Sequence, residues 1–565
     1  MRTRRLPRLI AVSALVGAVL FATAAPAWAH AVLQTTDPAA NAVLARAPEQ
    51  LSLHFSEPVE LSLGSVRLVS CSGKTVSTGA PKHGASDADV VVDGVPDLAN
   101  DTYVVLWRVI SADAHPVHGA FSFTVGTDAQ NIANCSANAA PESSSAVGEL
   151  FGFTRFLLFA GLALLIGGVV FWLAIAHGTS AAPRARVIAW TGWWATVIAT
   201  IAGVMLQGPY AAGTGIGDAV KWDVIDGVLD TRYGHRAIER LLYLVLGLFI
   251  LLMLGRADGR KKPNIVLIVA AGIVAVLLAS TPGRAGHAAT GDWTWAAIPL
   301  DTVHVLAMAI WFGGLVALIA TALGGGFSGG LRRALVNFAR IAFWCVVTLV
   351  VTGVFASWRQ VGFKLDGYTD TSFGNMLLVK LGIVVGLVAL AALSRKIVRA
   401  RKSAPLDAPD SVVAAIDDRT VKGLRKSVAG EVLLGVAVLV VTALLVHAQP
   451  ARTALQPRLF STEVTAGKGA NQMLVDVTID PAQTGVNAMH VYTLTPQGEN
   501  LTILRISGTF VNGEDQIPAE LKRGGANHFV NESLLLPEAG EWTLALHVFR
   551  AEIGDTAVAI KVPIR

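Results

Sequence analysis

Charged residues are scarce in this sequence, at 15% of 565 residues, whereas soluble domains carry about 25%. A water-soluble protein of this size could not cover its surface with so few charges. The composition therefore excludes a soluble enzyme, a disordered chain and a nucleic-acid-binding protein. Three cysteines exclude a disulfide scaffold and a cysteine-rich zinc protein. No Walker A or aspartyl-phosphate motif is visible, which excludes direct use of ATP.

The first 29 residues have the pattern of an export signal. Four arginines precede an apolar run from Leu9 to Ala25, and the segment ends in Ala27-Trp28-Ala29. A basic start, an apolar centre and a small-x-small ending are typical of a cleaved signal peptide. We expect residues 1–29 to be removed, so that the mature chain begins at His30. The alternatives are an uncleaved anchor helix and, from Arg4-Arg5, twin-arginine export.

Two segments alternate apolar and polar residues as half-buried strands do. In residues 30–137 the pattern is visible at 51–56 and 121–125, and in residues 450–565 it recurs at 473–479 and 542–548. Each segment is predicted to be a β-sandwich domain. A polar, Ser- and Pro-containing linker follows the first one, at 138–150.

Between these domains, residues 151–447 hold apolar runs near the roughly 20 residues that a bilayer requires. The eight runs are 151–176, 188–207, 237–254, 264–281, 298–322, 338–357, 375–394 and 428–447. If the first domain is exported, the inner loops carry 17 Lys and Arg and the outer loops 6, which is the positive-inside asymmetry. We therefore predict a mainly α membrane protein, an eight-helix transmembrane bundle flanked by two extracytoplasmic β-sandwich domains.

The mature N-terminus has the donors of a metal site. His30 would offer an α-amine and an imidazole, and Asp113, His115 and His118 cluster just before a predicted strand. Amine, imidazole and carboxylate donors suit a tetragonal Cu(II) centre, and the set has no thiolate or thioether to favour Cu(I). The alternative is that His115 and His118 are solvent-exposed loop residues.

The same residues carry a family resemblance. The matching motifs are His30-Ala31, Leu51-x-Leu53-x-Phe55-Ser56-Glu57-Pro58-Val59 and Ser111-x-Asp113-x-His115-Pro116-Val117-x-Gly119. They resemble the CopC family of periplasmic copper-binding proteins. The resemblance implies a Greek-key β-sandwich and Cu(II) bound by the amine and imidazole of His30 with His115 and Asp113. Ala114 departs from the glycine common in the family, and His118 is an extra donor that could bind axially.

Cys71 and Cys135 both lie in the predicted exported domain. An oxidising compartment favours a disulfide between them. The alternatives are two free thiols, or ligands for Cu(I).

Ionisable residues inside a membrane are costly and therefore indicate function. Asp301, His304 and Met308 are spaced by three and four residues, which puts them on one helical stripe. Imidazole and thioether together suit Cu(I). His287, in the preceding outer loop, is expected to pass copper to His304, and His235 with Glu239 form a second candidate for the path.

These residues also carry a resemblance. Gly286-His287-Ala288, Asp301-x-x-His304, Trp311-x-Gly313-Gly314-Leu315 and Thr371-Ser372-Phe373-Gly374 resemble the CopD family of copper-transport membrane proteins. The whole chain is similar to CopC–CopD fusion proteins of Gram-positive bacteria, and its C-terminal domain is similar to YtkA-like modules. His490, His528 and His547 in that last domain are expected to be surface residues.

The charged residues Glu239, Arg240, Lys380 and Glu431 of the apolar runs have an alternative interpretation. They could form ion pairs that orient helices.

We therefore predict a copper-binding and copper-importing protein of the plasma membrane, not an enzyme. Cu(II) is captured outside and copper, as Cu(I) in the membrane path, moves inward. The partners are the copper ion, the lipid bilayer and an extracytoplasmic copper chaperone or cuproenzyme, and no nucleic acid. Two alternatives remain: a copper-sequestering tolerance protein without flux, and a haem-containing membrane oxidoreductase.

Overall fold

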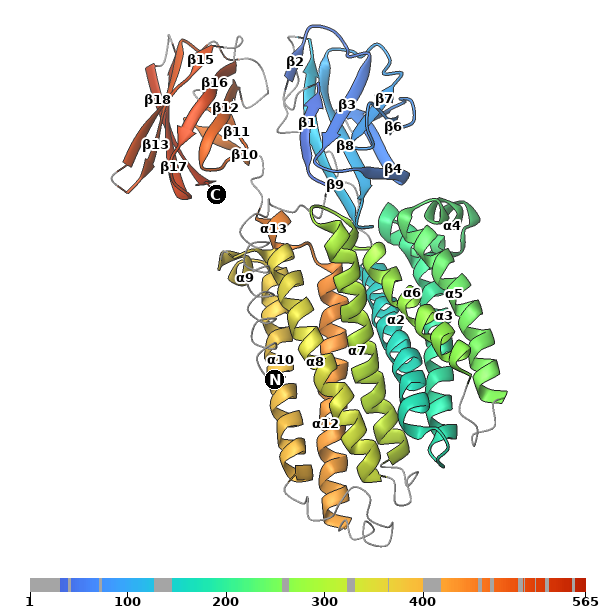
Figure 1. The fold of residues 1–565 in the computed structure, drawn as a ribbon. Coiled ribbons are helices and arrows are strands. Elements are labelled where there is room, and N and C mark those ends of the chain that lie inside the picture. The colour runs from blue at the N-terminus through green and yellow to red at the C-terminus, as the bar shows by residue number, and fades with distance from the viewer. Residues whose placement is uncertain are drawn as a thin grey trace, which may run out of the picture. The chain divides into compact units, whose positions relative to one another are not determined.

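The computed structural model describes most of the chain, and Figure 1 shows its elements. The described residues are 31–38, 42–70, 74–126, 145–256, 264–322, 331–363, 365–399, 418–455, 460–467, 472–495, 501, 503–513, 515–523, 528–550 and 554–564. The predicted signal peptide, His30, Cys71 and Cys135 lie outside them. The chain divides into two compact units. We call Thr154–Thr200 with Arg236–Arg452 the helical unit, and Ala31–Phe153, Ile201–His235 and Thr453–Arg565 the β-rich unit.

Two sheets form the N-terminal domain of the β-rich unit. One has the order β1-β3-β7-β6, and the other β2-β9-β8-β4-β5. The strands are β1 (Leu33–Asp37), β2 (Ala42–Leu44), β3 (Gln50–Phe55), β4 (Val59–Ser70), β5 (Thr75–Val76), β6 (Lys82–His83), β7 (Asp89–Asp93), β8 (Asp101–Ser111) and β9 (Pro116–Val125). Leu51 and Phe55 of β3 share one core with Trp107 of β8 and Phe123 of β9. Both sheets thus cover a common core, as the alternating sequence predicts.

The C-terminal domain repeats this layering with different strands. Its sheets have the orders β10-β11-β12-β16-β15 and β14-β13-β17-β18. The strands are β10 (Phe460–Ala466), β11 (Met473–Asp480), β12 (Gly485–Leu494), β13 (Arg505–Asn512), β14 (Asp515–Glu520), β15 (Lys522–Arg523), β16 (His528–Leu536), β17 (Gly540–Arg550) and β18 (Gly554–Ile564). The fully buried Trp542 lies in a core to which both sheets contribute. The strands predicted at 473–479 and 542–548 are confirmed as parts of β11 and β17.

Eight helices among the described residues are long and apolar enough to cross a membrane. They are α2 (Ser145–Phe171, extended by the π-helix η2, Trp172–Ala176), α3 (Ala182–Ala212), α5 (Arg232–Arg256), α6 (Ile265–Arg284), α7 (Thr294–Ala322), α8 (Leu331–Val361), α10 (Ser372–Arg399) and α12 (Asp418–His447). Short helices lie between them: η3 (Ile216–Val220), α4 (Trp222–Leu229), η4 (His287–Ala289) and α9 (Asp366–Thr369). A further one, α13 (Ala451–Ala454), follows α12. Exposed apolar side chains on α5, such as Leu242 and Phe249, are what a lipid-facing surface requires.

Glycines let α2 and α7 approach closely. A Cβ atom added to Gly313 of α7 would overlap the carbonyl oxygen of Ala163 on α2, and one added to Gly167 would overlap the carbonyl oxygen of Ala309. Without side chains at these positions the two backbones touch, as small residues allow in membrane helices. This contact fixes α7, which carries the predicted stripe, against α2.

Candidate metal centre

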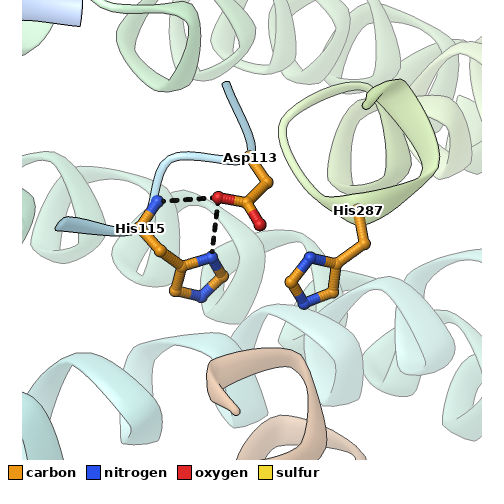
Figure 2. A group of neighbouring side chains, drawn as sticks. All are labelled: Asp113, His115 and His287. Carbon is orange, nitrogen blue, oxygen red and sulfur yellow. Dashed lines mark hydrogen bonds and ion pairs between the residues drawn. The ribbon is translucent and has the colours of Figure 1, made fainter. Parts of the chain in front are cut away.

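The turn between β8 and β9 brings two of the predicted ligands together. Asp113 is 1% exposed and His115 4%. Figure 2 shows Asp113 Oδ1 facing both the backbone nitrogen and the ring Nδ1 of His115, each at 3.2 Å. A buried carboxylate is expensive unless it meets a cation or hydrogen-bond donors. The buried carboxylate of Asp113 and the buried imidazole of His115 could therefore supply two of the ligands of a divalent metal ion.

Backbone geometry explains the departure at Ala114. This residue has φ = 68°, a left-handed conformation that favours glycine because it has no Cβ. The turn closes through hydrogen bonds from Ala114 N to Ser111 O and from Ser111 N to His115 O, both 2.9 Å. Ala114 keeps the conformation that a glycine would adopt more easily, so the turn retains its shape despite the substitution.

Ser111 ties the start of the described chain to this turn. Its Oγ accepts a hydrogen bond from Ala31 N at 3.1 Å and donates one to Glu57 Oε1 at 2.5 Å. The next residue, Val32, donates from its nitrogen to Ser56 Oγ at 3.0 Å. The residue that follows His30 is thus anchored two positions before Asp113. The sequence motif contains Ser56, Glu57 and Ser111, but nothing in the sequence gives them this role.

Helix α3 also holds the turn. Gln207, which is fully buried, donates from Nε2 to the carbonyl oxygen of Ala114 at 3.1 Å. Arg108, on β8, donates from Nε to the carbonyl oxygen of Ala211 at 2.6 Å. These bonds lie within the β-rich unit, and they connect the β8–β9 turn directly to the C-terminal end of a candidate membrane helix.

His118 does not join Asp113 and His115. It lies on β9 and is exposed. Among the described residues, no group of three or more His, Cys, Asp or Glu side chains that could hold a metal ion includes it. Its role as an axial ligand stays a prediction.

In the helical unit, the stripe of α7 packs against neighbouring helices. Asp301 lies against α6, where a Cβ atom on Gly283 would overlap its carboxylate. The same carboxylate interacts electrostatically with Lys380 of α10 and Arg359 of α8. Lys380 therefore has an interaction with Asp301, which sequence reasoning had not proposed. Met308 is partly buried against the bundle core.

His304 meets a hydroxyl on a neighbouring helix. Its Nδ1 lies 2.7 Å from Thr352 Oγ1 on α8. That hydroxyl has one proton, which it donates to the carbonyl oxygen of Thr348 at 2.7 Å. When it donates there, it accepts a hydrogen bond from Nδ1–H, and the lone pair of the His304 ring then lies on Nε2. Sequence reasoning missed Thr352, because it lies 48 residues away on another helix.

His287 is positioned by an arginine clamp. It lies on η4 and is 7% exposed; Figure 2 also draws it. The Arg359 guanidinium donates to the carbonyl oxygens of His287 at 2.6 Å, of Asp292 at 3.0 Å and of Thr290. One side chain of α8 thus holds the backbone of the whole 287–292 turn. No signal in the sequence marks Arg359 for this role.

The second candidate for the path looks different. His235 is exposed at the start of α5. Glu239 pairs with Arg236 and, at 2.8 Å, with Arg284 of α6. Arg240 donates to Thr281 Oγ1 at 2.7 Å. Glu239 therefore has the helix-orienting ion pairs of the alternative interpretation, although its partners are Arg236 and Arg284 rather than Arg240.

Comparisons with known proteins agree with this architecture. Residues 33–126 match the CopC domain family, residues 148–295 the N-terminal domain of copper resistance protein D-like proteins, and residues 332–445 copper resistance protein D. The copper transport protein CutJ of Bacillus subtilis is 25% identical over 546 residues, 94% of each chain. Copper resistance protein C of Escherichia coli is 32% identical over 118 residues, 20% of this chain and 93% of that protein.

Among solved structures, CopC from Methylosinus trichosporium OB3b is 34% identical, with a TM-score of 0.16, and covers 17% of this chain and 93% of its own. The family matches of residues 33–126, 148–295 and 332–445 confirm the predicted resemblance to CopC and CopD, whereas the YtkA-like resemblance of residues 450–565 stays a prediction. The relatives are copper transport or resistance proteins. This chain therefore joins a CopC domain and copper resistance protein D domains in one polypeptide and belongs to the copper transport or resistance proteins.

Proposed function

We propose that this protein captures Cu(II) at the β8–β9 turn and moves copper inward across the plasma membrane. The observation that carries the proposal is the anchoring of Ala31 to Ser111, on the strand that leads into the turn with Asp113 and His115. After cleavage at residue 29, His30 is the only residue ahead of that anchor. Its amine and imidazole then join Asp113 and His115 as the ligands of one ion.

The donor set favours Cu(II). An amine, two imidazoles and a carboxylate are nitrogen-rich and hard enough for a tetragonal Cu(II) centre. Copper is also the metal named in the relatives, including a copper transport protein that aligns over 94% of this chain. A residue added ahead of His30 is expected to weaken Cu(II) binding sharply, because the terminal amine becomes a distant amide. Unchanged affinity would show that the amine is not a ligand.

For the membrane path we propose the stripe on α7. Asp301 and His304 face α6 and α8 rather than lipid, and Met308 lies one turn further along the helix. His304 presents Nε2 as a ligand and Met308 a softer thioether, which suits Cu(I). Moderate binding sites in series allow an ion to move stepwise, as conduction requires. His287 is the proposed entry ligand.

Orientation follows from the charge asymmetry of the loops, with 17 Lys and Arg on the proposed inner side and 6 on the outer. Both β domains are then extracytoplasmic. Reporter fusions at Asp258 and Asp407 are expected to report the cytoplasm, and one at Gly291 the outside. A cytoplasmic signal at Gly291 would refute this topology.

Copper accumulation in cells tests the function. Cells that express the wild-type protein are expected to accumulate more copper than cells without it, and His304→Ala is expected to abolish the difference at equal membrane expression. Met308→Leu, which removes only the sulfur, gives a partial loss. Accumulation equal to that of cells without the protein, with copper tolerance retained, would instead indicate sequestration.

Substitutions of Thr352 test whether His304 binds copper in the transport path or only packs between helices. Thr352→Val removes the hydroxyl that meets Nδ1 of His304 and keeps the shape, so we expect reduced transport. Thr352→Ser restores the hydroxyl and is expected to restore transport. Equal transport by wild type and Thr352→Val would show that this contact of His304 does not matter for transport.

A further inference from the structure

The C-terminal domain places two imidazoles against each other. His490 lies on β12 and His528 on β16, and the nitrogens His490 Nδ1 and His528 Nε2 are 3.0 Å apart. In the register of these strands, His490 is opposite Val530 and Tyr492 is opposite His528. Both histidines therefore project from the same face of the sheet, away from the core residues Met489, Val491 and Phe529. The sequence predicts surface residues, and both side chains are partly buried on this face.

The nitrogen separation fits two ligands of one metal ion. Metal–nitrogen bonds to imidazole are about 2.0 Å long. Two such bonds at an angle between the square-planar and the tetrahedral value bring their nitrogens about 2.8–3.3 Å apart. The observed 3.0 Å lies inside this range. An ion can thus replace the hydrogen bond between the rings with only small side-chain movements.

The surroundings prepare both rings for a cation. Tyr492 stacks on His528 with a centroid distance of 4.3 Å and an interplanar angle of 4°, which fixes the plane of that ring. Asp480 and Glu532 place negative charge near His490. Burial lowers the pKa of His490, and burial followed by the neighbouring His490 lowers the pKa of His528 to about 4.

We propose that His490 Nδ1 and His528 Nε2 form a second Cu(II) site, on the C-terminal domain, with water as the further ligands. Imidazole nitrogens suit Cu(II), and copper is the metal of this family. The site is separate from the β8–β9 turn, and it does not depend on transport through the membrane domain.

Copper titration of the purified full-length protein in detergent tests the site, with Cu(II) alone as the probe. We expect His490→Gln and His528→Gln each to lower the number of tightly bound Cu(II) ions by one, because each change removes one of the two imidazole ligands. His547→Gln is the matched control. This histidine belongs to the same domain, but its side chain is 47% exposed and pairs with Asp555, so its replacement is expected to leave the copper count unchanged.

A His115→Ala variant separates this proposal from the proposed function. It is expected to lose the ion at the β8–β9 turn and to keep the one on the C-terminal domain. Pulsed electron paramagnetic resonance of its remaining Cu(II) should then show coupling to two imidazole nitrogens, a signal that His528→Gln reduces to one.

Three results would overturn the second site: an equal copper count in the wild type, His490→Gln and His528→Gln; an equal loss in the His547→Gln control; or no two-imidazole signal in His115→Ala. The last measurement leaves the C-terminal domain unmutated, so it decides the question even if a histidine variant of that domain fails to fold.

Discussion

Replacing Ser111 with alanine tests whether the anchored chain start positions a copper ligand. The change removes one oxygen, which accepts from Ala31 N and donates to Glu57. Ser111 is fully buried and Glu57 is 9% exposed, so water cannot fully replace either bond. A lost bond to a charged group costs about 1.5–3 kcal/mol, and a buried amide without its acceptor adds about 1 kcal/mol or more. We therefore expect the domain to lose about 2–4 kcal/mol of stability.

The copper affinity is the decisive measurement. If Ser111 holds His30 at the turn through Ala31, Ser111 orients a copper ligand without binding the ion itself. Removal of such an orienting residue typically weakens metal binding about 10–100-fold, and we expect this for Cu(II) in Ser111→Ala. Competition of Cu(II) between the protein and a chelator of known affinity measures this, and hydrogen exchange at β1 and β9 follows the stability. Ser52→Ala is the control, since Ser52 lies on β3 and makes neither of these bonds. A Ser111→Ala protein that is less stable but binds Cu(II) as tightly as wild type would refute the reasoning.

Two further predictions concern the bundle and the C-terminal domain. Gly313→Val should destabilise the bundle by at least about 1–3 kcal/mol because the new side chain overlaps α2, and thermal unfolding in detergent should show a lower midpoint. Gly272→Val, at a position with nothing within 4 Å, should leave the midpoint unchanged, and equal shifts would contradict the packing argument. The C-terminal domain should lose stability as pH falls from about 6.5 toward 4, because the unfolded chain binds protons at histidines whose pKa the fold lowers, to about 4 for His528. Hydrogen exchange of β12 and β16 between pH 7 and 4 measures this loss, and an equally steep loss in His528→Phe would show that His528 is not its source.

Periodicity was sufficient to predict the main elements. Apolar runs of bilayer length are strong signals, and each predicted run falls largely within a candidate span. The ends differ where polar residues continue a helix: the first span begins at Ala146 rather than at residue 151, because Glu149 lies inside the helix. The short α4 was not predicted, since eight residues among turn-forming ones give a weak periodic signal.

In the candidate sites, contacts between residues close in sequence could be predicted, and contacts between distant residues could not. Asp113 and His115 are two residues apart, so one turn was enough to predict that they meet. Contacts between distant residues, such as Ser111 with Glu57 or His304 with Thr352, depend on strand register and helix rotation, which local patterns do not contain. The pairing of His490 with His528 joins residues 38 positions apart, so the sequence showed two separate histidines and no site.

The backbone contact between Gly313 and α2 also limits how the membrane domain can move. Side chains absorb small displacements by changing rotamer, but two backbones in contact have no such freedom. Helices α2 and α7 therefore move together, and Asp301 and His304 keep their places relative to α2. Helix α8 contacts His304 through a single hydroxyl, that of Thr352. A rearrangement that exposes His304 therefore has to be a movement of α8. Because Arg359 belongs to α8 as well, displacement of that helix would release the His287 turn in the same movement, so that both histidines are exposed in one step.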